Sequence, residues 1–273
     1  TIESIKYFLS MELTLYQIDA FTSKVFSGNP AAVVPLDSWL DDKLLQSIAL
    51  ENNLSETSFI VPKSSGYEIR WFTPSSEIGL CGHATLATAY VVFSFPDYKS
   101  KTIKFESRSN GVLSVKHEGD FLSMDFPSEN LEACDPPDNL ISGLGIKPKS
   151  VFVGLDYLAV YDSLGDILAL NPDQHKLQKL DRRGVIVTAS APSESPADFV
   201  SRFFCPKYGV PEDPVCGSAH CMLTPYWASK MNKLDLLAHQ VSKRGGEIHC
   251  RLIEDRVELK GQAVQYLKGR IKF

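Results

Sequence analysis

The sequence predicts a mixed α/β fold with many short strands and few long helices. Alternating stretches rich in strand-forming residues recur along the chain, beginning with 13–21. Two stretches, 83–93 and about 217–230, are rich in small and apolar residues, which is typical of buried helices. Each follows a Cys-Gly pair, and Cys81 and Cys216 are 135 residues apart (216 minus 81), about half the chain. This short repeat is consistent with an internal duplication.

Local patterns place the other elements in order. In the first half, Leu44, Leu45, Ile48 and Ala49 share one face of an expected helix at 40–52. Strands are expected there at 13–21, 31–36, 57–61, 67–72, 101–107, 111–117 and 121–126. The segment 127–139 carries Pro127, Pro136, Pro137 and several acids, which predicts a linker. In the second half we expect strands near 150–154, 157–161, 184–189 and 199–205, a short helix near 163–170, and closing strands.

The composition is that of a globular protein and excludes several classes. With 44% hydrophobic and 22% charged residues among 273, global disorder is not expected. A net charge of −5 without a long basic block argues against nucleic acid and anionic membranes as partners. The longest mostly apolar run, near 86–95, is too short to cross a bilayer.

The start of the sequence and its cysteines indicate a cytoplasmic protein. Met11 stands directly before the first strand-like run, so residues 1–10 are expected to be a non-native or disordered extension. No signal peptide is visible in this stretch. The six cysteines are scattered without a CxxC pair, which favours reduced thiols.

The two Cys-Gly helix starts are the first candidate for chemistry. A thiol at a helix N-terminus feels the positive end of the helix dipole, which favours the thiolate. Gly82 and Gly217 would let a ligand approach the backbone N–H groups closely. Two thiols facing each other across a cleft could remove a proton from one face of a carbon and return one to the other. The alternative is that Cys81 and Cys216 are small buried hydrophobic residues.

Four further residues could carry protons. Glu56 stands where the first helix gives way to a strand, and a carboxylate buried at such a junction can act as a general acid/base. Asp213 precedes the second Cys-Gly helix, and His83 and His220 follow the two cysteines. The alternatives are a solvated loop charge for Glu56, an acidic turn complementing the helix dipole for Asp213, and structural roles for the histidines.

Several large classes of site have no signal in the sequence. We find no metal signature, since no HExxH motif or EF-hand loop occurs. No phosphate-binding or dinucleotide-binding glycine pattern is present. The Gly-x-Ser-x-Gly motif of many serine hydrolases is also absent.

Eight short motifs in one order resemble a known family. They are IDAF at 18–21, FSGNPAAV at 26–33, NLSET at 53–57, RWFTP at 70–74, GHA at 82–84, YGV at 208–210, EDP at 212–214 and GSA at 217–219. Together they resemble the PhzF-like phenazine-biosynthesis isomerases over essentially 11–273. The resemblance implies a diaminopimelate epimerase-like fold, in which two similar domains each wrap a barrel-like mixed sheet around a central helix.

The resemblance also implies a domain division and an assembly. The expected N-terminal domain spans 11–127 with about 263–273 returning to it, and the expected C-terminal domain spans 128–262. The active site would lie in the cleft between them. Members of the family are commonly homodimers and use neither a metal nor an organic cofactor, so neither is expected here.

The family's functional residues can be carried over to matching positions. Glu56 would be the general acid/base for proton transfer on a small carboxylate-bearing substrate, with His83 and Asp213 beside it. The resemblance implies that Ser218 contacts the substrate carboxylate, together with the N–H groups at Gly82 and Gly217. Asp19 and Asn29 match positions that line the cleft.

Two departures from the family keep other functions open. The chain carries both cysteines, as racemases and epimerases of the same fold do, alongside the PhzF-type Glu56. A two-thiol amino-acid racemase or epimerase using Cys81 and Cys216 is therefore the alternative. A non-catalytic homodimeric binding protein on the same fold is the third possibility.

Overall fold

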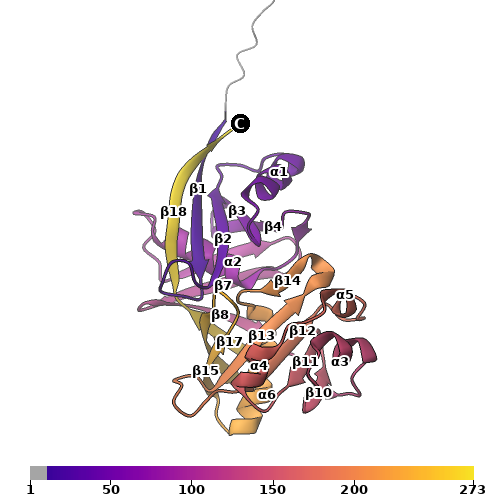
Figure 1. The fold of residues 1–273 in the computed structure, drawn as a ribbon. Helices are drawn as coiled ribbons and strands as arrows, with labels where there is room; N and C mark the ends of the chain where they lie inside the picture. Colours follow the sequence, from indigo (N-terminus) through magenta and orange to yellow (C-terminus); the bar gives the residue numbers. More distant parts are fainter. Residues whose placement is uncertain (1–10) are drawn as a thin grey trace, which may run out of the picture.

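The computed structural model describes residues 11–273, which form 18 strands and six α-helices in two lobes (Figure 1). The expected extension at 1–10 lies outside the described residues. The helices are α1 (Asp42–Asn52), α2 (Gly82–Phe93), α3 (Asp138–Leu144), α4 (Leu164–Ala169), α5 (Gln174–Leu177) and α6 (Gly217–Met231). No helix within 11–273 has the length and hydrophobicity to cross a membrane.

The strands follow the chain from one lobe into the other. Those of the first half are β1 (Glu12–Ala20), β2 (Asn29–Pro35), β3 (Glu56–Lys63), β4 (Gly66–Phe72), β5 (Glu77–Ile78), β6 (Thr102–Ser107), β7 (Gly111–Glu118) and β8 (Phe121–Pro127). Those of the second half are β9 (Glu132–Ala133), β10 (Ser150–Val153), β11 (Tyr157–Val160), β12 (Val185–Ser190), β13 (Phe199–Cys205), β14 (Val210–Asp213), β15 (Asp235–Gln240), β16 (Gly246–Ile253), β17 (Arg256–Gly261) and β18 (Ala263–Lys272).

In the first lobe, strands surround α2. β1 pairs antiparallel with both β2 and β18, β2 runs parallel to β3, and β3 pairs with β4. α2 packs against β1, β2, β3, β7, β8 and β18. Its apolar residues are buried on nearly every side, which explains why this helix has no polar face. The last strand thus lies beside the first, as Figure 1 shows in yellow and indigo.

The second lobe repeats this plan around α6. β11 runs parallel to β12, β12 pairs with β13, and β13 runs parallel to β15. β15, β16 and β17 form an antiparallel meander against which α6 packs. β17 then pairs with β8 of the first half, so hydrogen bonding continues between the lobes. The mixed α/β fold is confirmed, while the division into domains at 127/128 stays a prediction.

The predicted linker at 127–139 is only partly correct. Within it, β9 pairs with β10, and α3 begins at Asp138. No local sequence pattern predicts α3 or α5, because each helix is short and packs against the other. Gly143 of α3 lies so close to α5 that an added Cβ would be 2.6 Å from Leu177. The prolines mark the entry to a helix here, where Pro137 is the N-cap residue.

Candidate active site

The N-termini of α2 and α6 meet between the lobes. Cys81 and Cys216 are the N-cap residues of the two helices, and neither side chain caps its helix. A Cβ atom placed on Gly82 or Gly217 would lie 4.0 Å from the Cα of the other glycine. Two sets of N–H groups and two positive dipole ends therefore converge, which suits a bound carboxylate.

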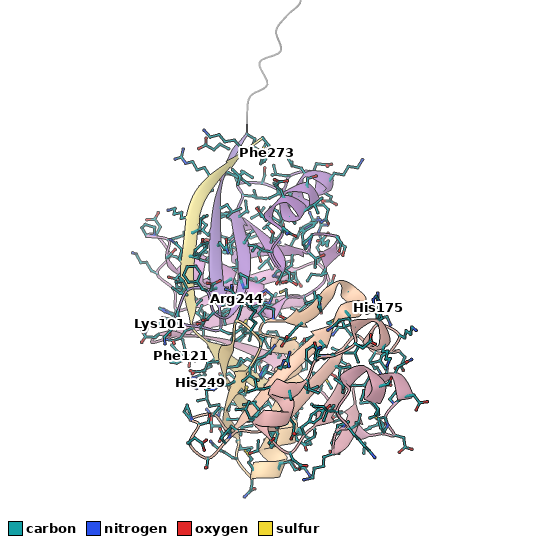
Figure 2. The ribbon with its side chains drawn as sticks, in the orientation of Figure 1. Lys101, Phe121, His175, Arg244, His249 and Phe273 are labelled. Atoms are coloured by element: carbon teal, nitrogen blue, oxygen red, sulfur yellow. The ribbon has the colours of Figure 1, made fainter. Side chains whose placement is uncertain are left out.

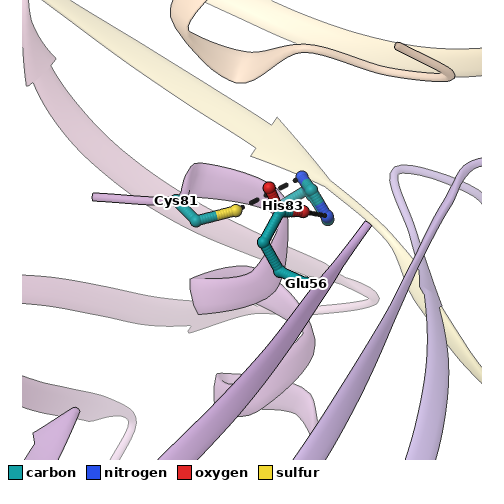
Figure 3. A group of neighbouring side chains, drawn as sticks. All are labelled: Glu56, Cys81 and His83. Atoms are coloured by element: carbon teal, nitrogen blue, oxygen red, sulfur yellow. Dashed lines mark hydrogen bonds and ion pairs between the residues drawn. The ribbon is translucent and has the colours of Figure 1, made fainter. Parts of the chain in front are cut away.

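Glu56, His83 and Cys81 form a chain of three side chains beside this junction (Figure 3). His83 Nε2 lies 2.9 Å from Glu56 Oε2, as an ion pair rather than a well-aligned hydrogen bond. His83 Nδ1 lies 3.5 Å from Cys81 Sγ. The imidazole thus stands between a carboxylate and a thiol, with a different nitrogen facing each. Protons can pass along such a chain.

Asn29 lies between His83 and Asp213, which belongs to the other half of the sequence. Its Nδ2 lies 2.7 Å from Asp213 Oδ1, 2.9 Å from the Val215 carbonyl oxygen and 3.2 Å from His83 Nδ1. An amide has only two hydrogens, and the two shorter contacts use both. His83 Nδ1 is therefore left to Cys81. Asn29 is completely buried and acts as a bridge between the lobes.

Burial and neighbouring charges set the protonation of the site. Burial alone would lower the pKa of His83, but the nearby Cys81 and Glu56 raise it well above 6.5. Burial raises the pKa of Cys81 to about 11, and burial also raises that of Cys216 well above 9.0. Burial raises the pKa of Asp213 to about 6, although His83 opposes this shift. Burial therefore disfavours the thiolate form of both cysteines.

The raised pKa of Asp213 predicts a pH-dependent effect of Asp213→Asn on stability. The folded protein holds this proton more tightly than the unfolded chain, whose carboxyl has the ordinary pKa of 3.8. The resulting stabilisation is fully present below pH 3.8 and is lost as the pH rises through about 6. Because the amide never ionises, the stability of Asp213→Asn relative to wild type should rise by roughly 1 to 2 kcal/mol between pH 5 and pH 8. Chemical denaturation at both pH values measures it, and a pH-independent difference would contradict it.

Ser218 and Cys216 lie beside an arginine that the sequence analysis missed. Ser218 Oγ is 3.2 Å from Cys216 Sγ and accepts a hydrogen bond of 2.9 Å from Arg183 Nη2. Arg183 in turn pairs with Asp156, a fully buried carboxylate. Arg183 stands in an ordinary-looking loop before β12, so only the fold brings it to the second Cys-Gly helix.

His220 does not form the expected pair with the Cys216 thiol. Its Nδ1 lies 2.7 Å from the carbonyl oxygen of Cys216, to which it donates as the neutral imidazole. Burial lowers the pKa of His220 to about 4, so it stays uncharged. The spacing of four residues placed the ring one turn along α6, where it bonds the backbone carbonyl of Cys216 instead of the thiol.

Asp19 is engaged outside the group around His83. Its Oδ1 accepts a hydrogen bond of 2.8 Å from Arg244 Nη2, and its Oδ2 accepts one from the Phe26 N–H. Both oxygens of this buried carboxylate are occupied by the protein. These contacts favour a structural role for Asp19, and the predicted part of Asp19 and Asn29 in lining the cleft and binding the substrate stays a prediction.

A cavity of about 530 Å³ lies near these side chains, but Glu56, Cys81 and His83 do not line it. Figure 2 places Arg244 and Phe121, two of its lining residues, at the waist between the lobes. Gln240 forms the wall between cavity and site, because its amide bonds the Asp213 carbonyl and the Cys216 N–H. None of the acids or thiols at the two helix ends lines the cavity, so the cavity and the candidate site are separate features.

Glu56, Cys81 and His83 also form a group of metal-ligand types that the sequence motifs did not reveal. One ligand atom from each lies within 4.8 Å of the others. However, the carboxylate and the thiol face opposite nitrogens of the imidazole. A metal bound by one nitrogen would require rotation of at least one of the three side chains. The observed arrangement is suited to proton transfer.

Comparison with known proteins gives the family. A family model described as "Phenazine biosynthesis-like protein" (PhzC-PhzF) matches residues 18–269. The chain belongs to the PhzF family. An uncharacterized isomerase of Pseudomonas aeruginosa is 51% identical over 261 residues, covering 96% of this chain and 99% of that protein. A crystal structure of a PhzF-family protein from Enterococcus faecalis has a TM-score of 0.92 at 44% identity, covering 96% of this chain and 99% of the other.

The PhzF family shares its fold with amino-acid epimerases. A hydroxyproline epimerase from Agrobacterium vitis superposes with a TM-score of 0.63 at 10% identity, covering 96% of this chain and 91% of the epimerase. At this identity the likeness shows the fold alone. It confirms the epimerase-like fold that the motifs of this PhzF-family chain implied.

Proposed function

We propose that this protein is an isomerase that moves a proton on a small carboxylate-bearing substrate, with Glu56 as the general acid/base. One observation carries the proposal: the Glu56 carboxylate contacts the buried His83 directly beside the facing N-termini of α2 and α6. The side chain of Glu56 is 15% exposed, so it is shielded yet open to a ligand. The isomerase name of the relative from Pseudomonas aeruginosa supports this reaction class.

The geometry suggests a separate role for each part of the site. The substrate carboxylate would lie at the converging N–H groups of Gly82 and Gly217, where both helix dipoles stabilise negative charge. Glu56 would take a proton from a substrate carbon near that carboxylate. The electron pair left on this carbon would delocalise toward the substrate carboxylate. Return of the proton to another carbon completes the isomerisation without net change in atoms. His83, whose pKa the neighbouring charges raise, would stabilise the Glu56 carboxylate before the proton is taken and again after it has been returned.

Solvent hydrogen exchange tests this function. The protein is incubated in D₂O with a panel of dihydroaromatic amino acids, proline, pyrrole-2-carboxylate and diaminopimelate, and deuterium incorporation is followed by NMR. Incorporation with a shifted double bond supports the proposal. Inversion at an α-carbon without a bond shift would contradict it and favour an epimerase.

The two-thiol racemase remains a second candidate because Cys81 and Cys216 occupy matching positions at facing helix ends. Such a mechanism needs one thiolate, whereas burial raises the pKa of both thiols. We therefore expect Cys81→Ser and Cys216→Ser to keep turnover within roughly tenfold of wild type, since general acid/base groups are worth about 10²–10⁴. Steady-state rates of both variants measure this. Loss of more than about 100-fold in each variant would favour the two-thiol mechanism.

A further inference from the structure

We infer that Arg183 is a substrate-binding residue whose guanidinium binds the substrate carboxylate beside Cys216. The inference rests on the proposed function, which requires a carboxylate-bearing substrate, and it names the side chain that recognises that group. Ser218 Oγ links Arg183 Nη2 to Cys216 Sγ through contacts of 2.9 Å and 3.2 Å. The guanidinium therefore lies at the N-terminus of α6, where the helix dipole also favours an anion.

The protein holds this guanidinium in a fixed orientation. Asp156 accepts bonds from both Nε and Nη2, and its side chain is completely buried. The guanidinium lies 5.1 Å above the ring of Phe203. The Arg183 side chain nevertheless remains 29% exposed. A rigid, partly exposed arginine with one edge fixed by a buried acid is preorganised for a planar anion.

Arg202 shows what a purely structural arginine looks like in the same lobe. It pairs with both oxygens of Glu212 and lies 4.9 Å above the ring of Phe204, next along β13 from Phe203. Its Nη1 donates to the carbonyl oxygens of Ile167 and Leu170, so all three guanidinium nitrogens of Arg202 have acceptors within the protein. Within residues 11–273, Arg183 Nη1 has no such acceptor, so two donors remain for a ligand.

These donors select a charged, planar carboxylate over a neutral amide. An amide offers one acceptor oxygen and no charge, whereas a carboxylate can accept from Arg183 Nη1 and from the N–H groups of α6 together. The substrate carbon next to that carboxylate would then lie near Cys216. Arg183 thus makes the acid group an obligatory part of the substrate.

Alkylation of Cys216 tests the inference without knowledge of the natural substrate. Iodoacetate and iodoacetamide differ only in carrying a carboxylate or an amide, and each forms a C–S bond with the thiolate while iodide leaves. Rates at each cysteine are measured by peptide mass spectrometry in wild type, Arg183→Gln, Arg183→Lys and Arg202→Lys. The iodoacetate-to-iodoacetamide ratio cancels any change in thiolate fraction, because both reagents need the same thiolate.

We expect wild-type Cys216 to prefer iodoacetate, and Arg183→Gln to lower the ratio roughly tenfold to a hundredfold, as loss of hydrogen bonds to a charged group predicts. Arg183→Lys keeps the charge but not the fork, so its ratio should fall by a smaller factor. If Arg183→Gln does not fold, the ratio measured for Arg183→Lys still tests the inference. Arg202→Lys should keep the wild-type ratio at Cys216, and the ratio at Cys81 should not change in any variant.

Three results would overturn the inference. They are a ratio at Cys216 that Arg183→Gln leaves unchanged, an equal fall in Arg202→Lys, and a Cys216 that neither reagent reaches in wild type. Glu56→Gln should leave the ratio unaltered, because Glu56 does not contact this arginine. Failure of the labelling test is therefore distinguishable from failure of Glu56 as the acid/base.

Discussion

Glu56→Gln is expected to lower turnover by at least ~100-fold, the smallest effect typical of a general acid/base. Glutamine keeps the size of the side chain and can still contact His83 Nε2 through its oxygen. It cannot accept a proton from a carbon, so binding should survive while the chemical step fails. Steady-state kinetics on a substrate found by solvent exchange, with ligand binding measured in parallel, separates the two effects.

The control for this variant is Glu51→Gln. Glu51 is exposed on α1, one turn before the strand that carries Glu56, and it lies outside the polar cluster. Its replacement should leave turnover unchanged. A Glu56→Gln enzyme with more than a tenth of wild-type turnover would show that another group moves the proton.

Asn29→Ala is expected to destabilise the protein more than any other single change in the site. Asp213 Oδ1 and the carbonyl oxygen of Val215 would lose the donor that now bonds them. Each buried acceptor left without a partner costs about 1–3 kcal/mol, so we expect a loss of about 3 kcal/mol or more. The melting temperature should fall by roughly 6–12 °C, as judged from proteins of similar size. Turnover should fall as well, since Asp213 loses the donor that now holds its carboxylate in place.

Ser55→Ala separates this effect from general disturbance of the loop. Ser55 Oγ makes only a 3.3 Å contact with Asn29 Oδ1. Its removal should therefore cost less than about 1 kcal/mol. Equal losses of stability in the two variants, measured by calorimetry, would show that Asn29 does not bridge the lobes in the way described.

The fold was largely predictable because its signals are local. The N-cap Asp41, the one-sided apolar pattern of α1 and the all-round apolar α2 can each be read within a dozen residues. Two of the site's features are local too, since Cys81 and His83 are neighbours in sequence and the Cys-Gly pairs open their helices. The short α3 and α5 depend on each other, and no local pattern marks them.

The remainder of the site depends on contacts distant in sequence. Asn29 and Asp213 are 184 residues apart, and Arg183 reaches Ser218 across 35. A single sequence holds no information on which polar residues the two lobes will bring together. The motifs that resemble the PhzF family placed Glu56, His83 and Asp213, but they did not distinguish the bridging role of Asn29 or reveal Arg183.

The pairing of β18 with β1 has a consequence for how the protein is made. The N–H groups of Met11 and Phe273 each bond the other's carbonyl oxygen. One edge of β1 therefore has no hydrogen-bonding partner until β18 is present. While the ribosome is still producing β18, one edge of β1 remains open, which is a site for misassociation. The first lobe, which holds Glu56 and His83, can close only after residues 263–272 of β18 have emerged. The candidate site of a nascent chain therefore forms only after β18 has been made, and chaperones that shield open strand edges should affect the yield of folded protein.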